Sequence, residues 1–140
     1  MKVLVCGGRS YRDRVYAFSV LDRLHAKYGF TCVVHGGAGA VVEETASQPE
    51  YTIGADLLAG EWAKARGLEV RAYPVTQAEW DQYGLSAGPR RNGLMLEKES
   101  PELVVAFPGG RGTRNMTNKA RWAHVKVVEV PATLKLLVLE

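Results

Sequence analysis

The sequence predicts an α/β protein: one Rossmann-like domain over residues 1–140, with a doubly wound, mainly parallel sheet of five or six strands and helices on both faces. Short valine- and leucine-rich runs alternate with longer helical stretches, which is the order of repeated βαβ units. Most of the short runs are continuously apolar, as expected of strands that helices cover on both faces. Such folds bind ligands at the carboxyl ends of the strands, near the point where the strand order reverses.

Five β-rich runs account for the expected strands. They cover residues 2–6, 30–35, 69–73, 103–107 and 126–130. A further segment, 132–140, follows Pro131 and contains four leucines. Its pattern fits either a sixth strand or a short helix.

Four helices are expected between the strands, over residues 13–28, 55–66, 90–97 and 113–123. The first two are each followed by a glycine, the residue expected beyond a helix C-terminus. In the first helix the expected buried stripe is Val15, Phe18, Leu21, Leu24 and Tyr28. In the second helix it is Leu58, Trp62 and Ala65. In the fourth helix it is Thr113, Met116, Ala120 and Ala123. Segments 41–53 and 76–87 do not fit the βα unit and are predicted to be loops over the carboxyl edge of the sheet.

The composition is that of an ordinary globular protein. Of its 140 residues 46% are hydrophobic, so the chain can bury a core without disulfides or a structural metal. The net charge of +3 is compatible with an anionic ligand but does not by itself indicate DNA binding. Cys6 and Cys32 are expected to be buried and reduced, and the histidines are too scattered for a sequence-local metal site. No apolar run approaches the ~20 residues of a membrane span, so we expect a cytoplasmic protein without a membrane partner.

Glycine clusters follow three of the expected strands. They are Cys6-Gly7-Gly8-Arg9-Ser10, His35-Gly36-Gly37-Ala38-Gly39 and Pro108-Gly109-Gly110-Arg111-Gly112-Thr113. Glycine lets a ligand approach the backbone closely, so consecutive N–H groups can face one anion, and a helix that starts just after adds its positive end. A single glycine pair is more often only a tight turn. Three pairs at strand ends favour a phosphate site.

Two common nucleotide motifs are missing. The dinucleotide fingerprint Gly-x-Gly-x-x-Gly with an acidic residue closing the second strand is not present, because that strand ends in His35. No Gly-Lys-Ser/Thr occurs either. Nicotinamide hydride transfer and P-loop hydrolysis of ATP or GTP are therefore both disfavoured.

Several side chains beside the turns are candidate ligand contacts. Arg90 and Arg91 are expected at the start of the third helix, where cations oppose the helix dipole and an anion would relieve the conflict. Asp56 opens the second helix, where it either accepts from a ribose hydroxyl or only complements the dipole. The remaining candidates next to the glycine clusters are Arg9, Asn92, Arg111 and Thr113, the last of which can also cap its helix. Trp80 and Tyr83 fit either base stacking or core packing.

The motifs resemble those of the SLOG superfamily, in particular its YpsA-related branch. Members resemble Val-Cys-Gly-Gly-Arg, then His-Gly-Gly-Ala running into Gly-Ala-Asp, then Gly-Pro-x-Arg-Asn and Pro-Gly-Gly-x-Gly-Thr, and all occur here in order over most of the chain. One departure is an insertion of about a dozen residues at 41–53. The resemblance implies a Rossmann-like fold that binds a nucleoside phosphate, NAD or an ADP-ribose-like ligand, with no required cofactor. Homo-oligomers are also compatible with it.

The superfamily includes the Lonely Guy phosphoribohydrolases, in which an arginine and a glutamate are associated with catalysis. The arginine aligns with Arg91, which becomes the candidate catalytic residue, but the glutamate aligns with Met116. A thioether cannot stabilise positive charge on a ribose, so N-glycosidase activity is the alternative function, with Asp56, Glu43 or Glu44 as substitute carboxylates. DprA proteins share the fold, and single-stranded DNA binding is the least expected function. Its candidate basic face comprises Arg90, Arg91, Arg111, Arg114, Lys119 and Arg121.

Overall fold

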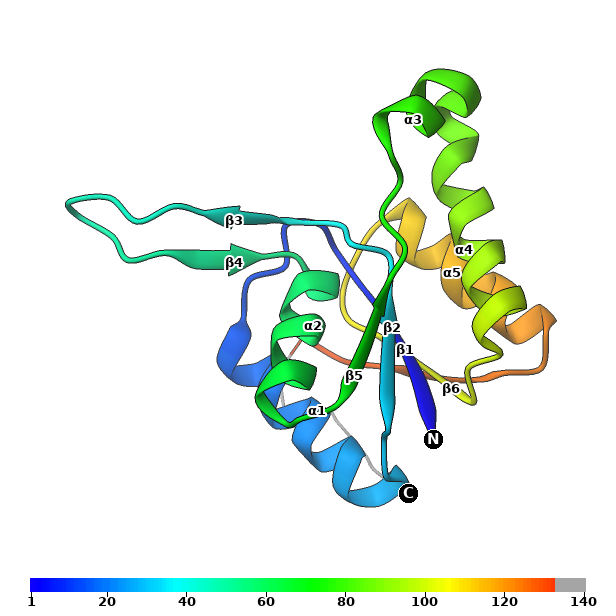
Figure 1. Cartoon of the computed structure of the whole chain (residues 1–140). Coiled ribbons are helices and arrows are strands. Elements are labelled where there is room, and N and C mark those ends of the chain that lie inside the picture. Colours follow the sequence, from blue (N-terminus) through cyan, green and yellow to red (C-terminus); the bar gives the residue numbers. More distant parts are fainter. Residues whose placement is uncertain (133–140) are drawn as a thin grey trace.

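The computed structural model describes residues 1–132 and contains a five-stranded, all-parallel sheet (Figure 1). The strand order is β5 (Glu69–Ala72), β2 (Cys32–His35), β1 (Lys2–Cys6), β6 (Leu103–Ala106), β7 (Lys126–Glu129). Every neighbouring pair is parallel. The predicted fold class is therefore confirmed, with five strands in this sheet. The predicted sixth strand or helix at 132–140 lies outside the described residues, except for residue 132.

Two helical layers enclose the sheet, and the residues of β1 alternate between them. Val3 and Val5 pack with α1 (Arg14–Tyr28) and α2 (Ala55–Ala65). Leu4 and Cys6 face the opposite side, where the core includes buried residues of α4 (Ala87–Glu99) and α5 (Arg111–Trp122). Both faces of the central strand are buried, which explains its continuous apolar run. No helix within residues 1–132 has the length and apolar character needed to cross a membrane.

The predicted helices exist, but their buried faces differ from the predicted stripes at several positions. In α1 the buried residues are Ala17, Val20, Leu21 and Leu24, whereas Val15 is 79% exposed. The predicted stripe advanced mainly in steps of three, which drifts around a helix of 3.6 residues per turn. In α2 and α5 the predicted Leu58, Trp62, Met116 and Ala120 are buried, but Ala65 and Ala123 are exposed and Ala63 and Thr117 are buried instead.

Segment 41–53 is not a loop over the sheet edge, and that prediction was wrong. It lies within an antiparallel hairpin of β3 (Ala40–Val42) and β4 (Tyr51–Ile53), which projects away from the sheet (Figure 1). Valine, tyrosine, threonine and isoleucine favour extended backbone here. Gly39 and Gly54 sit face to face at the base with φ of +130° and +111°, and a Cβ on Gly54 would lie 2.7 Å from the Gly39 Cα.

Segment 76–87 is also more ordered than predicted. It forms α3 (Gln77–Tyr83), a 3₁₀ turn η1 (Gly84–Ser86) and the start of α4. Thr76 and Glu79 form a capping box at the start of α3. Because α4 begins three residues earlier than predicted, Arg90 and Arg91 lie beyond its first three positions rather than at its N-terminus. Pro89 is tolerated in that first turn because its missing N–H has no helical acceptor there.

Candidate functional site

A cavity of about 250 Å³ opens at the carboxyl ends of the central strands. It lies where the strand order reverses, since β2 and β6 flank β1 on opposite sides. Ten of the predicted site residues line it: Gly7, Gly8, Arg9, Gly36, Asp56, Arg91, Asn92, Gly110, Gly112 and Thr113. Cys6, Ala38, Met95 and Met116 complete the wall. All three glycine turns thus converge on one cavity.

The first turn is built for close approach of secondary structure elements. A Cβ on Gly7 would lie 2.8 Å from the Cβ of Phe107 and would also contact Ala55 at the start of α2. The N–H of Gly8 donates to the carbonyl of Pro108 at 2.8 Å. This glycine pair therefore joins the first turn to the third, and one of its N–H groups is already used.

The second turn directs its N–H groups at side chains of the same chain. Gly37, with a φ of +72°, donates to Nδ1 of His35 at 2.9 Å. Ala38 donates to Oδ2 of Asp56 at 3.1 Å. Burial lowers the pKa of His35 to about 4, so the imidazole is neutral at physiological pH. The second turn consequently binds the Asp56 carboxylate of α2 where a phosphate was expected.

The third turn leaves donors free. Gly110 is the N-cap of α5, and no side chain caps this helix. Within residues 1–132, the N–H groups of Arg111, Gly112 and Thr113 have no hydrogen-bond acceptor in the protein. They are the first three helical N–H groups, which point out of the helix at its positive end.

Asp56 is the carboxylate that lines the cavity. It is only 5% exposed and comes from the first turn of α2. Burial raises the pKa of the Asp56 carboxyl to about 6, while the hydrogen bond from Ala38 and the charge of Arg91 lower it. Glu43 and Glu44, the other carboxylates considered, are exposed near the hairpin tip and do not line the cavity.

Arg91 reaches across the carboxyl ends of β2 and β5. Its Nη1 donates to the carbonyls of Gly36 and, at 3.3 Å, Tyr73, and its Nε donates to Oδ1 of Asn92 at 3.0 Å. Within residues 1–132 no carboxylate lies within 4.0 Å of its guanidinium. Burial lowers the pKa of Arg91, and the nearby charge of Asp56 raises it. The guanidinium is half-buried and has no carboxylate partner in the described part of the chain.

Asn92 connects α4 to the third turn. Its side chain is buried, and its Nδ2 donates to the carbonyl of Gly112 at 3.3 Å and to Oδ1 of Asn115 at 3.1 Å. Because its Oδ1 also accepts from Arg91, a single amide positions both the guanidinium and the start of α5.

A second cavity of about 220 Å³ adjoins the first and shares Arg9, Gly36, Ala38 and Arg91 with it. Its other lining residues are Gly37, Gly39, Pro74, Val75 and Trp80. Trp80 of α3 is half-buried, so part of its ring is accessible from this side. The two cavities are therefore neighbours with a shared wall, and Trp80 lines only the second.

Three predicted contacts lie elsewhere. The guanidinium of Arg90 stacks over the ring of Tyr83, 3.8 Å from its centroid, and lines neither cavity. The Arg111 side chain is exposed and also lines neither. Gly109 lines a third cavity of about 290 Å³ beside the ends of β6 and β7, which shares Gly110 and Thr113 with the first cavity.

Four residues of the wall were not among the predicted ligand contacts: Cys6, Ala38, Met95 and Met116. Cys6 was assigned only to the core, although its place directly before Gly7 puts it at the strand end. Burial raises the pKa of its thiol to about 12, so it is not a nucleophile at neutral pH. Ala38 contributes through its N–H, a signal that no side-chain pattern carries. Met116, buried at 1% exposure, lies at the cavity wall where the glutamate of the phosphoribohydrolases was expected.

The chain is similar to known proteins over two different lengths. Curated proteins give no match to it. A crystal structure of UDP-GlcNAc 2-epimerase from Neisseria meningitidis bound to UDP-GlcNAc is similar with a TM-score of 0.49 and 15% identity, covering 96% of this chain and 33% of that one. This chain therefore spans about a third of that protein. Residues 1–48 match the model of the YspA, cpYpsA-related SLOG family. These residues contain the first two glycine turns, and the match agrees with the resemblance that the motifs predicted.

Proposed function

We propose that the two adjoining cavities bind a nucleotide or a nucleotide-derived ligand. The observation that carries the proposal is the convergence of all three glycine turns with Asp56 and Arg91 on one cavity at the switch point of the sheet. Each cavity is smaller than the roughly 300 Å³ at the low end of small-molecule sites. A ligand with two chemically different halves, one in each cavity, suits this division.

The phosphate belongs at the start of α5. Three free N–H groups and the positive end of a helix lie there, and Thr113 lines the cavity beside them. A charge-assisted hydrogen bond contributes roughly 1.5–3 kcal/mol and the dipole about 0.3–1 kcal/mol. Arg9, exposed at the end of β1, adds a positive charge at the same cavity.

The sugar belongs in the first cavity, beside Asp56, and the base belongs in the adjoining one. Asp56 is placed to accept from a ribose hydroxyl, as carboxylates do in related folds. Trp80 and Pro74 line the adjoining cavity and offer a surface for a base, whose stacking on an aromatic ring is worth about 1–3 kcal/mol.

A thermal unfolding series tests this proposal. AMP, NAD, ADP-ribose and inorganic phosphate are each added to the purified chain, and at least one nucleotide is expected to raise the Tm, since ligand at about 100 times its Kd adds about 2.7 kcal/mol. Arg91→Ala should remove the shift. Arg90→Ala is the matched control, because Arg90 lies on Tyr83 and outside both cavities. An unchanged Tm with every nucleotide contradicts the proposal.

Asp56→Asn separates the parts of the ligand. If this carboxylate accepts from ribose, the variant should lose affinity for ADP-ribose and keep its affinity for inorganic phosphate. Equal loss for both would instead place Asp56 at the phosphate.

A second candidate function, nucleotide N-glycosidase, is favoured by one observation. Asp56 and Arg91 share the cavity, so a carboxylate is available although Met116 occupies the family position of the glutamate. In that reaction water adds to C1′ of the ribose as the bond to the base breaks, and the carboxylate stabilises the positive charge on the sugar. Chromatography of AMP incubations should then show free adenine, abolished in Asp56→Asn. Intact AMP after prolonged incubation rejects this activity and leaves binding.

A further inference from the structure

The β3–β4 hairpin and the outward face of α5 carry opposite charge, and of their charged residues only Arg121 has an ion-pair partner among residues 1–132. We propose that copies of this chain associate head to tail, with the acidic hairpin of one copy docked on the basic face of α5 of the next. The association uses other side chains than the nucleotide site, since the charged side chains of the hairpin and of α5 line neither of the two cavities that we assign to the ligand.

The hairpin is uniformly acidic. Between residues 40 and 53 there are three glutamates, Glu43, Glu44 and Glu50, and no lysine, arginine or histidine. All three are exposed, and none forms an ion pair with another group in residues 1–132. Because the whole chain has a net charge of +3, the remainder of the molecule carries six net positive charges.

The hairpin is preformed. The ladder pairs Ala40 with Ile53 and Val42 with Tyr51, and the packed glycines fix its base. At the tip, the N–H of Thr45 donates to the carbonyl of Gln48 at 2.8 Å, and the N–H of Gln48 donates to Oγ1 of Thr45 at 3.1 Å. A two-stranded hairpin is marginally stable on its own, so a partner that covers the hairpin stabilises it. Because the hairpin is already ordered before docking, little conformational entropy is lost when it docks.

The outward face of α5 is its complement. This helix contains four cationic residues, Arg111, Arg114, Lys119 and Arg121, and no acidic residue. At 3.6 residues per turn they lie with Asn115, Asn118 and Trp122 on the side opposite Met116, Thr117 and Ala120, which are buried. Only Arg121 has a carboxylate partner among residues 1–132, at 3.2 Å from Glu129.

An aromatic side chain stands within this basic face. Trp122 is 89% exposed and borders a hollow of about 520 Å³ with Asn115, Asn118, Lys119 and Arg121. Exposed tryptophan is enriched at interfaces, where its ring supplies contact area and its N–H a donor. On the hairpin, Val41 is 53% exposed and supplies an apolar group beside the glutamates.

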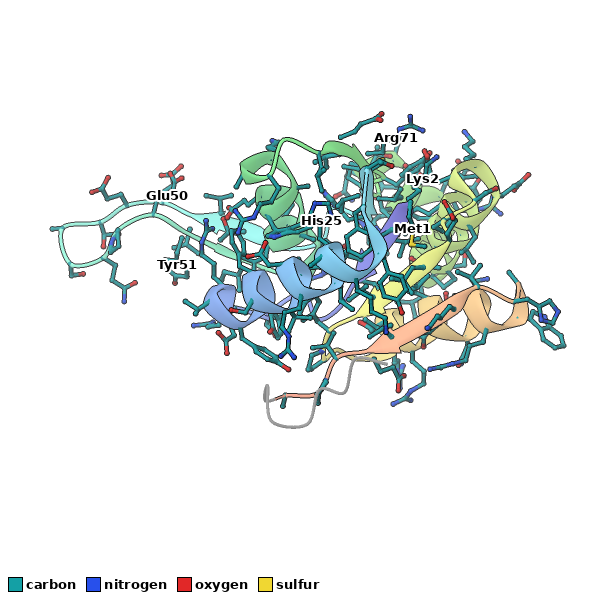
Figure 2. The ribbon with its side chains drawn as sticks, turned by 90° about the horizontal axis from the view of Figure 1, so that it is seen from below. Met1, Lys2, His25, Glu50, Tyr51 and Arg71 are labelled. Carbon is teal, nitrogen blue, oxygen red and sulfur yellow. The ribbon has the colours of Figure 1, made fainter. Side chains whose placement is uncertain are left out.

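The two surfaces cannot meet within one molecule. Figure 1 and Figure 2, viewed at right angles, both place the hairpin, with Glu50 and Tyr51 labelled in Figure 2, at the opposite end of the molecule from α5. Contacts between different patches are heterologous and produce rings or open chains rather than a two-fold dimer. Exposed ion pairs are individually weak and screened by salt. The association should therefore be concentration-dependent and salt-sensitive.

Sedimentation velocity with the intact chain tests the proposal. At about 50 mM salt the average mass should rise with concentration, and at about 500 mM it should fall toward the monomer. Glu43→Lys/Glu44→Lys and, separately, Arg114→Glu/Lys119→Glu should each weaken association by at least about tenfold. A mixture of the two variants should associate again, because the reversed charges match. Asp81→Lys/Glu97→Lys, at exposed sites on α3 and α4, is the charge-matched control and should associate like the unmodified chain.

Three results would overturn this assembly. One is a monomer at every concentration in low salt, and another is unchanged association of the hairpin variant. The third is a monomer that retains single-stranded DNA through Arg114 and Lys119, which would assign the basic face to nucleic acid. Circular dichroism checks that the variants are folded. The Tm response of Glu43→Lys/Glu44→Lys to nucleotides should be unchanged, because the hairpin glutamates line neither cavity, and this separates the test from that of the nucleotide site.

Discussion

The carboxylate of Asp56 accepts a hydrogen bond from the main-chain N–H of Ala38 at 3.1 Å, although the two residues are 18 positions apart in the sequence. The bond ties the second glycine turn to the start of α2. It also means that the turn holds a protein carboxylate in the cavity, beside Arg91, whose guanidinium has no acidic partner within 4.0 Å in residues 1–132. The N–H groups of Gly37 and Ala38 are therefore bonded to side chains of the same protein, whereas those of Arg111, Gly112 and Thr113 have no acceptor within residues 1–132.

Asp56→Asn should stabilise the protein at neutral pH. The folded-state pKa of Asp56 is about 6, above the value of about 3.9 in an unfolded chain. As the pH rises from about 4 to about 6 the unfolded chain loses this proton first, so the wild type loses stability on the order of 3 kcal/mol across that window. Urea unfolding at pH 7 and pH 4 measures the free energy of unfolding. Asp56→Asn should be more stable than the wild type at pH 7, and this gain should vanish near pH 4. Asp81→Asn, exposed on α3, controls for net charge.

Glu99→Gln should have the opposite pH dependence. Glu99 is buried and accepts hydrogen bonds from Tyr73, Lys2 and Arg71, which lower its pKa to about 2. Its contribution is complete above about pH 4.3, the unfolded value, and is lost as the pH falls toward 2. The variant should lose about 1.5–3 kcal/mol at pH 7 and show a flatter acid unfolding curve.

The control for Glu99→Gln is Glu97→Gln, at an exposed position of the same helix. It should change the free energy of unfolding by less than about 0.5 kcal/mol. Equal losses for both variants would contradict the role given to the buried carboxylate.

Two glycine-to-alanine substitutions should act in opposite directions. Gly7→Ala puts a Cβ 2.8 Å from that of Phe107 and against Ala55, so overpacking should cost about 1–3 kcal/mol. Gly93→Ala, inside α4, meets no atom within 4 Å and should stabilise by up to about 1 kcal/mol. Unfolding in guanidinium chloride measures both changes in the free energy of unfolding. A Gly7→Ala variant of unchanged stability would refute the close packing of the first turn.

Asn92→Ala should weaken nucleotide binding indirectly, because the polar atoms of Asn92 bond to other protein groups. Its amide accepts from Arg91 and donates to Gly112, so its loss frees the guanidinium and the start of α5 together. We expect about tenfold weaker binding of ADP-ribose by calorimetry, equal to about 1.4 kcal/mol. Asn92→Asp keeps the acceptor for Arg91 but lacks both donors, so a milder effect would show that positioning of Arg91 dominates.

Local patterns in the sequence determined the parallel sheet and the positions of the glycine turns. Continuous apolar runs report burial on both faces, and glycine after a strand reports a tight turn, whatever the rest of the chain does. The same reasoning mistook residues 41–53 and 76–87 for loops, because short segments rich in polar residues carry little periodic signal.

Only the tertiary structure decided which N–H groups of the turns are already bonded and which arginine lines the cavity. Arg90 and Arg91 are neighbours in sequence, yet one lies on Tyr83 and the other bonds to Gly36, 55 residues away. Helix geometry turns adjacent side chains about 100° apart, so a shift in where α4 begins, together with its packing against β2, selects the residue that faces the site. Such contacts depend on distant partners, and no local pattern contains them.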